Sequence, residues 1–495
     1  MAEASDGGGK RRQDVILIGP IGTGKSTVGK LLAEGLGLPQ VAMDFVRFGY
    51  YEEIGYDEDL ADEIERREGF AGKYRYWKLF EIDAVERILA EHRDCVIDFG
   101  GGHSVYEDDA LFERARRALA PYDNVVLLLP SPDLDESVRL LRERHGAPIV
   151  DHDLDFDEHF VKHHSNHDLA TMTVYTKDKT PEQTCEEILP RLQRSPAWDV
   201  SLEARPSTLE RANARYAAGK LANARGEYEQ AQRLIEESLS VRHRLGTKRQ
   251  VAESLQELGD VAKNQGEYAR ARTTLAQSLE LRRQLDTAPD IARTLHLLGM
   301  VAREELDFRT AGDWFEQALS VWRDLGRKKP VAGVLAMVGE SAREQGDYAR
   351  AAAALEECLA LHEEAENRWA IAATHCAQGD LALARAEYVL AQARYEESLR
   401  LGRELKDQRA SARALEGLAG LAAAQGQVER ALRFGGAITA LRGSKPRSRV
   451  EQALVDRWLQ PARQQLDEQA SAAAWAAGEA MSLEEATHYA LEASG

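Results

Sequence analysis

The sequence predicts a three-layer α/β domain with a parallel sheet, followed by an all-α solenoid of repeated helix pairs. In the first 195 residues, short apolar runs alternate with stretches of helical periodicity, as in parallel sheets covered by helices. Beyond residue 207 the chain repeats itself with a period of 40 residues. A chain of 495 residues is also too long for a single hydrophobic core, so separate domains are expected.

The elements of the first domain follow from this alternation. Strands are expected at short, mostly apolar runs of four or five residues, and helices where apolar residues recur at a spacing of three or four. The expected strands are 15–18, 40–43, 95–99, 125–129 and 172–175. The expected helices are 26–36, 57–68, 73–91, 107–119, 133–144 and 181–193.

Composition excludes several classes of protein. The formal net charge is −19, most of the excess lies in the first 195 residues, and no basic stripe is present, which disfavours nucleic-acid binding. No apolar run approaches the ~20 residues of a membrane span. Residues 1–12 lack the apolar core of a signal peptide, and the four cysteines show no metal-binding spacing. We expect a cytoplasmic protein with no nucleic-acid or membrane partner.

Residues 15–26 carry the most specific motif. An apolar strand leads into Gly-Pro-Ile-Gly-Thr-Gly-Lys-Ser, which fits the phosphate-binding loop G-x-x-x-x-G-K-[ST], and a helical pattern follows. A chance glycine-rich turn is the alternative, but a strand before and a helix after favour the motif. The motif predicts ATP and Mg²⁺ as cofactors, with nucleotide-binding residues Gly19, Gly22, Thr23, Gly24, Lys25, Ser26 and Thr27.

Polar residues follow the second and third expected strands. Ligands of parallel sheets bind at the carboxyl ends of strands, so these residues are site candidates. Asp44 follows one strand, and Asp98 ends the next, where a carboxylate could hold Mg²⁺ together with Ser26. A strand-terminal aspartate can also be a helix cap or a turn residue. Directly after Asp98 come the candidate substrate-binding residues Gly100, Gly101, Gly102 and His103.

Together these features resemble shikimate kinase and its relatives over residues 13–193. The phosphate loop, Asp44, the glycine triplet and Leu169-Ala170-Thr171-Met172 occur in the order of that family. The resemblance implies a nucleoside-monophosphate-kinase fold and phosphoryl transfer from ATP to a hydroxyl group. It implies that Asp44 is the base for the acceptor hydroxyl and that the triplet binds the acceptor. It further implies a mobile lid over 139–168, in which Arg142 or Arg144 clamps the phosphates.

The sequence also departs from the family pattern. Ala42 stands where the resemblance implies a second aspartate, and Asp98 is the candidate to replace that carboxylate. Lys78 and Lys162 stand near the places of the two arginines that hold the substrate carboxylate in shikimate kinases. Lysine does not reproduce a bidentate arginine. We therefore expect Lys78 and Lys162 to contact an acceptor other than shikimate.

The predicted lid is rich in histidine. Six of the 13 histidines lie there, mixed with aspartates, and His159 and His163 would share one face of a helix. A zinc site is one interpretation, although spacing fixes no third ligand. A solvated lid, sensitive to pH, is the other. The histidines are His145, His152, His159, His163, His164 and His167.

The second half resembles tetratricopeptide repeats. A Gly-x-Tyr turn followed three residues later by alanine recurs in register, as in residues 226–231, 266–271 and 346–351. Helix pairs of this kind stack into a superhelix with a groove for a protein, a peptide or another copy of the chain. The predicted organisation is a lead-in at 1–12, the kinase-like domain at 13–195, a linker at 196–207, repeats at 208–441 and a helical cap at 442–495.

Two functions fit the sequence. The first is a small-molecule kinase with a helical-repeat domain for protein interaction or self-assembly. Its predicted catalytic residues are Lys25, Asp44, Asp98, Arg142 and Arg144. The second is a signalling or scaffold protein in which the nucleotide state controls partner binding by the repeats. A kinase transfers phosphate to its acceptor far faster than to water, whereas a switch shows only slow hydrolysis.

Overall fold

The computed structural model describes residues 12–146, 150–151, 154–193, 208–443 and 447–492. The chain forms two compact units, Met1–Gln265 and Gly266–Gly495. Residues 1–11 of the predicted lead-in and the whole predicted linker lie outside the described residues. No helix within the described ranges is both long and apolar enough to cross a membrane.

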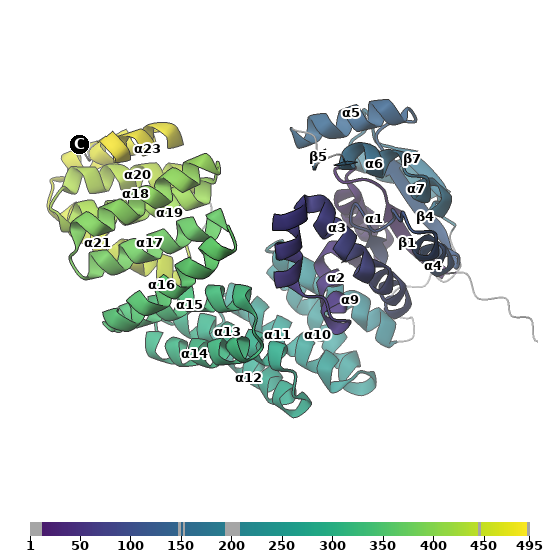
Figure 1. Cartoon of the computed structure of the whole chain (residues 1–495), viewed down its shortest axis with the longest axis horizontal. Helices are drawn as coiled ribbons and strands as arrows, with labels where there is room; N and C mark the ends of the chain where they lie inside the picture. The colour runs from purple at the N-terminus through teal and green to yellow at the C-terminus, as the bar shows by residue number, and fades with distance from the viewer. Residues whose placement is uncertain (1–11, 147–149, 152–153, 194–207, 444–446, 493–495) are drawn as a thin grey trace, which may run out of the picture. The chain divides into compact units, whose positions relative to one another are not determined.

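The first unit contains the predicted parallel sheet. Five strands are ordered β2-β3-β1-β4-β7, and every neighbouring pair is parallel (Figure 1). The strands are β1 Arg12–Ile18, β2 Gln40–Ala42, β3 Val96–Asp98, β4 Tyr122–Leu129 and β7 Met172–Tyr175. The helices are α1 Lys25–Leu36, α2 Met43–Glu53, α3 Glu58–Glu91, α4 Asp109–Leu119, α5 Leu134–His145, α6 Phe156–Lys162, α7 His164–Leu169 and α8 Pro181–Ile188.

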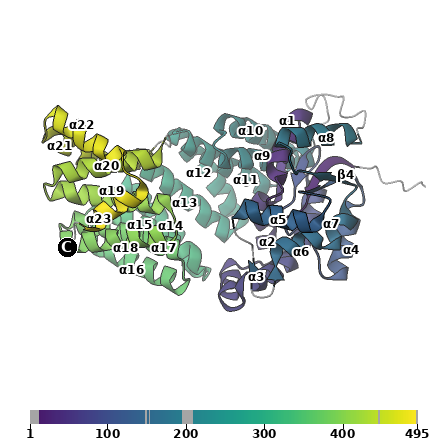
Figure 2. The same cartoon turned by 90° about the horizontal axis from the view of Figure 1, so that it is seen from above.

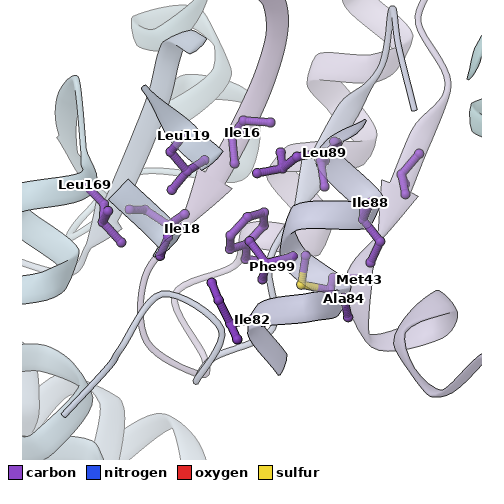
Figure 3. Packing of buried hydrophobic residues seen from close by; sticks show 14 of the residues in the cluster. Ile16, Ile18, Met43, Ile82, Ala84, Ile88, Leu89, Phe99, Leu119 and Leu169 are labelled. Atoms are coloured by element: carbon purple, nitrogen blue, oxygen red, sulfur yellow. The ribbon is translucent and has the colours of Figure 1, made fainter. Parts of the chain in front are cut away.

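The two faces of the sheet bury separate hydrophobic clusters. Ile16 and Ile18 of β1 point into one cluster, and Val15 and Leu17 point into the other, because successive strand residues face opposite sides. The first cluster contains residues of α2, α3 and α4, and the second contains residues of α1 and α8. Figure 3 shows Phe99, just beyond β3, among the packed side chains of the first cluster. The predicted three-layer α/β fold is therefore confirmed.

The structure differs from the predicted elements in a few places. The second strand ends at Ala42, and helix α2 begins at Met43, where no helix was predicted. The two helices predicted at 57–68 and 73–91 are consecutive parts of α3, separated by a non-helical Gly69. The lid region adds a hairpin, β5 Val150–Asp151 paired with β6 Leu154–Asp155, before α6.

The first unit also includes the first three repeat helices. These are α9 Leu209–Ala224, α10 Tyr228–Leu245 and α11 Lys248–Asn264. Helix α9 packs against β2, α2 and α3. Ala214 and Ala217 of α9 belong to the same buried cluster as Ile16 and Phe99. The first repeat thus shares its hydrophobic core with the kinase-like domain.

The second unit is all α-helical, as predicted. Successive helices pack pairwise, and the alanine that follows each turn by three residues is fully buried in every pair from Ala271 to Ala431 (Figure 2). The helices are α12 Tyr268–Leu285, α13 Ala288–Glu304, α14 Phe308–Asp324, α15 Lys328–Glu344, α16 Tyr348–Glu364, α17 Arg368–Ala384, α18 Tyr388–Glu404, α19 Gln408–Ala424, α20 Val428–Arg442, α21 Arg449–Gln464, α22 Glu468–Glu479 and α23 Leu483–Glu492.

Helices α20 and α22 cross at two glycines. A Cβ added at Gly478 would lie 1.9 Å from the carbonyl oxygen of Arg433, and one added at Gly436 would lie 2.1 Å from that of Trp475. Because backbone atoms form both contacts, no side chain can move aside. We expect Gly478→Ala to destabilise the second unit by about 1–3 kcal/mol in chemical denaturation. Gly333→Ala, at a position with open space, is the control; equal stability of the two variants would contradict the expectation.

Candidate active site

The phosphate-binding loop connects β1 to α1. Gly22 and Gly24 have φ of 79° and 87°, a region that favours glycine, so the loop can bring its amide groups together. Helix α1 begins at Lys25, and none of the described side chains caps its N-terminus. Ser26 and Thr27 are exposed at the first turn. The uncapped amides and the helix dipole together suit an anionic phosphate.

Lys25 lies folded against this loop. Its Nζ donates to the carbonyl oxygens of Gly19 and Pro20, each at 2.7 Å, and Thr23 Oγ1 donates to the same Pro20 oxygen at 2.9 Å. Burial lowers the pKa of Lys25 to about 8, although Asp44 and Asp98 both act to raise it. The ammonium group is thus held next to the loop, where a β- or γ-phosphate would meet it.

The depressed pKa of Lys25 gives a testable proton linkage. An anionic phosphate favours the charged amine, so nucleotide binding should move this pKa from about 8 toward its ordinary 10.5. We expect binding of ADP at about pH 9 to take up a proton, which calorimetry in buffers of different ionisation enthalpy measures. Affinity should therefore fall as the pH rises above about 8. In the Lys25→Arg variant the guanidinium stays protonated, so ADP binding should take up no proton. Equal proton uptake by the variant and the wild type would show that the proton does not bind to Lys25.

Ser26 and Asp98 meet at the metal side of the site. Ser26 Oγ donates to Asp98 Oδ1 at 2.9 Å, and Gln40 Nε2 donates to Asp98 Oδ2 at 2.6 Å. Burial raises the pKa of Asp98, while Gln40, Ser26 and Lys25 act to lower it. Asp98 is also the register partner of Ala42 in the neighbouring strand. The carboxylate missing from β2 is thus matched by one on β3, directly beside it.

The residues on this side fit a magnesium ion. A hydroxyl and a carboxylate oxygen at hydrogen-bond distance form the hard oxygen donor pair that Mg²⁺ prefers near a phosphate. Asp98 is 3% exposed, and Lys25, the cation that acts on it among the described residues, is held by backbone carbonyls. A divalent cation bound here would therefore balance the negative charge of the Asp98 carboxylate.

Asp44 stands in the first turn of α2, on the acceptor side. Its side chain is 56% exposed, and its Oδ1 lies 3.6 Å from Nη1 of Arg47. Arg47 also approaches Nε2 of His103 at 3.4 Å, and its guanidinium lies over the rings of Phe48 and Trp77. Burial lowers the pKa of His103 to about 4, so this imidazole is neutral at pH 7. Asp44 and Arg47 thus form an opposite-charge pair, with Asp44 next to Gly100 and Arg47 next to His103.

Lys78 reaches the glycine triplet as well. Its Nζ donates to the Gly102 carbonyl oxygen at 2.6 Å and to Glu81 Oε2 at 2.5 Å. Burial alone would raise the pKa of Glu81, but the charge and hydrogen bond of Lys78, together with the charge of Arg47, outweigh it and hold that pKa below its usual value. The charge of Lys78 is therefore balanced by a buried carboxylate. The sequence-predicted residues Asp44, Lys78, His103 and the triplet do come together here.

The lid helices place their charged residues differently. Arg144 Nη1 donates to the Gly22 carbonyl oxygen at 3.0 Å, so it lies at the phosphate loop. Arg142 pairs with Asp155 of β6. Lys162 of α6 pairs with Asp135 of α5 at 2.7 Å and with Glu158 of its own helix at 2.6 Å. Of the predicted lid cations, Arg144 reaches the loop, whereas Arg142 and Lys162 are engaged in ion pairs within the lid region.

The lid histidines mostly bind carboxylates. His159 Nε2 lies 2.7 Å from Glu107 Oε1, and the His163 and His164 rings stack with centroids 4.7 Å apart. His152 lies outside the described residues. The described histidines, cysteines and acidic residues include no group of three or more placed to hold a metal ion.

Several residues of the site lie outside the sequence motifs and were not predicted. Gln40 binds Asp98, 58 residues away, Glu81 is a buried carboxylate paired with Lys78 on the same helix, and Arg47 lies on the unpredicted helix α2. His145 packs against Gly22, since a Cβ there would lie 2.5 Å from its Nε2. The one available hint was Gln40 itself, a polar residue in an otherwise apolar buried strand.

Comparison with known proteins agrees with this geometry. The family model described as shikimate kinase matches residues 21–193. The tetratricopeptide-repeat model matches residues 210–284 and 290–364. The shikimate kinase of Streptomyces coelicolor is 33% identical over 185 residues, which are 35% of this chain and 92% of that protein. That of Francisella tularensis subsp. holarctica is 36% identical over 92 residues, 19% of this chain and 47% of the relative.

Solved structures align with both parts of the chain. Shikimate kinase from Acinetobacter baumannii in complex with shikimate gives 20% identity and a TM-score of 0.26, covering 37% of this chain and 93% of its own. BtubC from P. vanneervenii gives 17% identity and a TM-score of 0.37, covering 40% and 81%. A Rap protein complexed with competence and sporulation factor gives 11% and 0.40, covering 63% and 92%.

The Streptomyces relative is matched over nearly its whole length. The family model match begins within the phosphate loop, at residue 21, and contains Asp44, the glycine triplet and the lid. The repeats that follow match a separate family model. The chain therefore belongs to the shikimate kinase family, with tetratricopeptide repeats fused behind the kinase domain.

Proposed function

We propose that the protein transfers the γ-phosphoryl group of ATP to a hydroxyl group of a small polar molecule. The observation that carries this proposal is the convergence of Lys25, Ser26, Asp98 and Asp44 around one edge of the sheet. A nucleotide sensor needs the first three residues only. A carboxylate beside the glycine triplet is useful when a hydroxyl group must lose its proton.

The nucleotide side supplies positioning and charge. The loop amides and Lys25 would hold the β- and γ-phosphates, and Ser26 with Asp98 would hold Mg²⁺. The ion, when bound, neutralises charge on the phosphates. Arg144 lies against the loop at Gly22 and would add positive charge to the transferred group.

The acceptor side supplies the base. Asp44 Oδ1 lies close to Gly100, since a Cβ at that glycine would be 2.4 Å away. A hydroxyl group lying against the triplet would be within reach of this carboxylate, which would accept the proton as the oxygen attacks phosphorus. Arg47, 3.6 Å from Asp44, would orient the carboxylate or contact the acceptor.

The charges of the pocket suggest the class of acceptor. Glu81 neutralises Lys78, His103 is uncharged, and Lys162 is held by two carboxylates. Among these residues the remaining cation is Arg47, which contacts His103 directly after the triplet. It already lies beside Asp44. This balance favours a neutral polyol, or one of low charge, over an acid such as shikimate that is held by bidentate arginines.

The direct test is ADP release with Mg²⁺ and a panel of acceptors that includes shikimate, nucleosides and aminocyclitols. We expect a neutral hydroxyl compound to stimulate turnover well above hydrolysis, and Lys25→Ala to abolish both. Arg233→Ala, an exposed change on α10, is the matched control. If no acceptor stimulates turnover, or if shikimate is the best of the panel, the transfer or its acceptor class is refuted.

A nucleotide-controlled scaffold is the second candidate function. The shared core of the first repeat and the kinase domain favours it, because a change at either one can affect the other. The tetratricopeptide match supports a protein, a peptide or a second copy of the chain as partner, in the cytoplasm where ATP is available. In that case turnover would be slow, independent of acceptors and sensitive to Lys25→Ala, while partner binding would change with the nucleotide.

A further inference from the structure

The turn between α9 and α10 contacts the metal side of the kinase site. Arg225, at the end of α9, donates from Nη2 to Gln40 Oε1 at 3.1 Å. Two residues later, Glu227 forms an ion pair with Lys30 of α1. Lys30 lies in α1, the helix that follows the phosphate loop, and Gln40 is the first residue of β2. Neither contact belongs to the kinase family, because the repeat helices lie outside the matched residues 21–193.

Gln40 links this turn to the candidate Mg²⁺ ligands. Its Nε2 donates to Asp98 Oδ2 at 2.6 Å and to the backbone oxygen of Ser26 at 2.9 Å. Both of these partners only accept hydrogen bonds, so the amide nitrogen must face them and its oxygen must face Arg225. Arg225 only donates, and it therefore stabilises this one orientation of the amide.

The space around Gln40 is closely fitted. Gln40 is 6% exposed, and a Cβ at Gly29 of α1 would lie 2.9 Å from its Nε2. A flipped amide would point its oxygen at the Asp98 carboxylate and at the Ser26 carbonyl, which repel it. Losing the donor from Arg225 removes the group that opposes this flip and leaves a buried carbonyl oxygen without that partner.

We propose that Arg225 is a positioning residue of the kinase: through Gln40 it holds Asp98 and Ser26 in the arrangement that binds Mg²⁺. The first repeat then completes the metal side of the site instead of only following it in the chain. This inference rests on the proposed role of Ser26 and Asp98, but it is independent of the acceptor and of transfer itself. It also gives the repeats a route to the nucleotide, since any partner that displaces the α9–α10 turn changes Mg²⁺ affinity, and Mg²⁺ reciprocally favours the docked turn.

The test measures binding, not turnover. The affinity for ADP is determined by calorimetry with and without Mg²⁺, and the ratio gives the contribution of the ion. We expect Arg225→Ala to weaken Mg²⁺ binding by about tenfold, as loss of a residue that orients metal ligands commonly does. ADP affinity without Mg²⁺ should stay unchanged, which also shows that the loop is folded. Arg225→Lys retains a donor and should recover most of the loss.

Glu227→Gln is the matched control, because it removes the ion pair to Lys30 from the same turn without contacting Gln40. If Glu227→Gln weakens Mg²⁺ binding as much as Arg225→Ala does, the effect is general undocking of the repeat, and the proposal fails. It also fails if Arg225→Ala leaves Mg²⁺ affinity unchanged.

A double-mutant cycle locates the effect at Gln40. In a Gln40→Met chain, the further change Arg225→Ala should have no additional effect on Mg²⁺ affinity. Full additivity would overturn the route through Gln40. If wild-type ADP binding shows no dependence on Mg²⁺, the metal role of Ser26 and Asp98 in the proposed function is wrong, and this inference with it. A failed acceptor panel alone would leave it standing.

Discussion

Replacing Asp98 by alanine is expected to lower the rate of ATP turnover by about 10²- to 10³-fold. Asp98 Oδ1 accepts from the Ser26 hydroxyl, and it is the buried carboxylate next to the phosphate loop. Without it, Mg²⁺ loses a charged oxygen neighbour at the place where charge develops on the transferred group. Turnover measured against Mg²⁺ concentration should show both a lower maximum and a higher half-saturating concentration.

The strand register provides a rescue. Ala42 of β2 is the partner of Asp98 across the β2–β3 ladder, so the two side chains lie side by side on the same face of the sheet. We expect Ala42→Asp combined with Asp98→Ala to recover at least about tenfold of the lost turnover, because the carboxylate returns to a neighbouring position. Ala42→Asp alone, which places two carboxylates together, should be less active than wild type. A folded double variant as inactive as Asp98→Ala at every Mg²⁺ concentration would count against a metal role for this position.

The parts of the site closest to the phosphate loop could be predicted from the sequence. The loop motif fixes a strand, a turn and a helix within a dozen residues, so local spacing suffices to place Lys25 and Ser26. Asp98 could be expected because it ends a short apolar run, and carboxyl ends of parallel strands share one edge. The buried alanines of the repeats could also be predicted from local spacing, because each one follows its turn by three residues and the pattern recurs every 40 residues.

The remaining features depend on contacts between distant segments. Helix α2 contains Phe45, Phe48 and Tyr51, residues with weak helical preference, and it forms because packing against α3 and the sheet outweighs that preference. Gln40 binds Asp98, 58 residues away, and Arg47 lies on that helix. No local sequence pattern indicates the proposed role of Arg225, which lies 185 residues from Gln40.

The packing of α9 against β2, α2 and α3 could not be predicted from the sequence. Helix α9 contributes Ala214 and Ala217 to the core beneath β2, and Arg211 and Asn213 bind Asp94 and the Glu91 carbonyl oxygen. Small residues allow the helix to approach the sheet, and the same small residues are expected in any tetratricopeptide helix pair. Their pattern therefore predicts a packed helix without indicating which surface it packs against.

Replacing Asp44 by asparagine is expected to have the largest effect on transfer relative to hydrolysis. A general base in this position contributes about 10²- to 10⁴-fold, so acceptor-stimulated kcat should fall by that factor. The substitution keeps the size of the side chain and its exposed place in the first turn of α2. Affinity for Mg²⁺ and nucleotide, measured by calorimetry at about pH 6, where Lys25 is protonated in both proteins, should stay within about twofold. Asp44 contacts neither the loop amides nor Ser26 among the described contacts.

This pattern separates the two candidate functions. Lys25→Ala removes a phosphate contact and should abolish turnover of every kind, whereas Asp44→Asn should spare the slow hydrolysis that needs no acceptor proton to be removed. Asp44→Glu is the informative intermediate, because it restores a base one methylene further from Cα and should recover part of the rate. If Asp44→Asn transfers phosphate as fast as wild type while Lys25→Ala is inactive, the proton is accepted elsewhere. The carboxylate would then serve chiefly to hold Arg47 beside the glycine triplet, where that guanidinium would be the main contact for the acceptor.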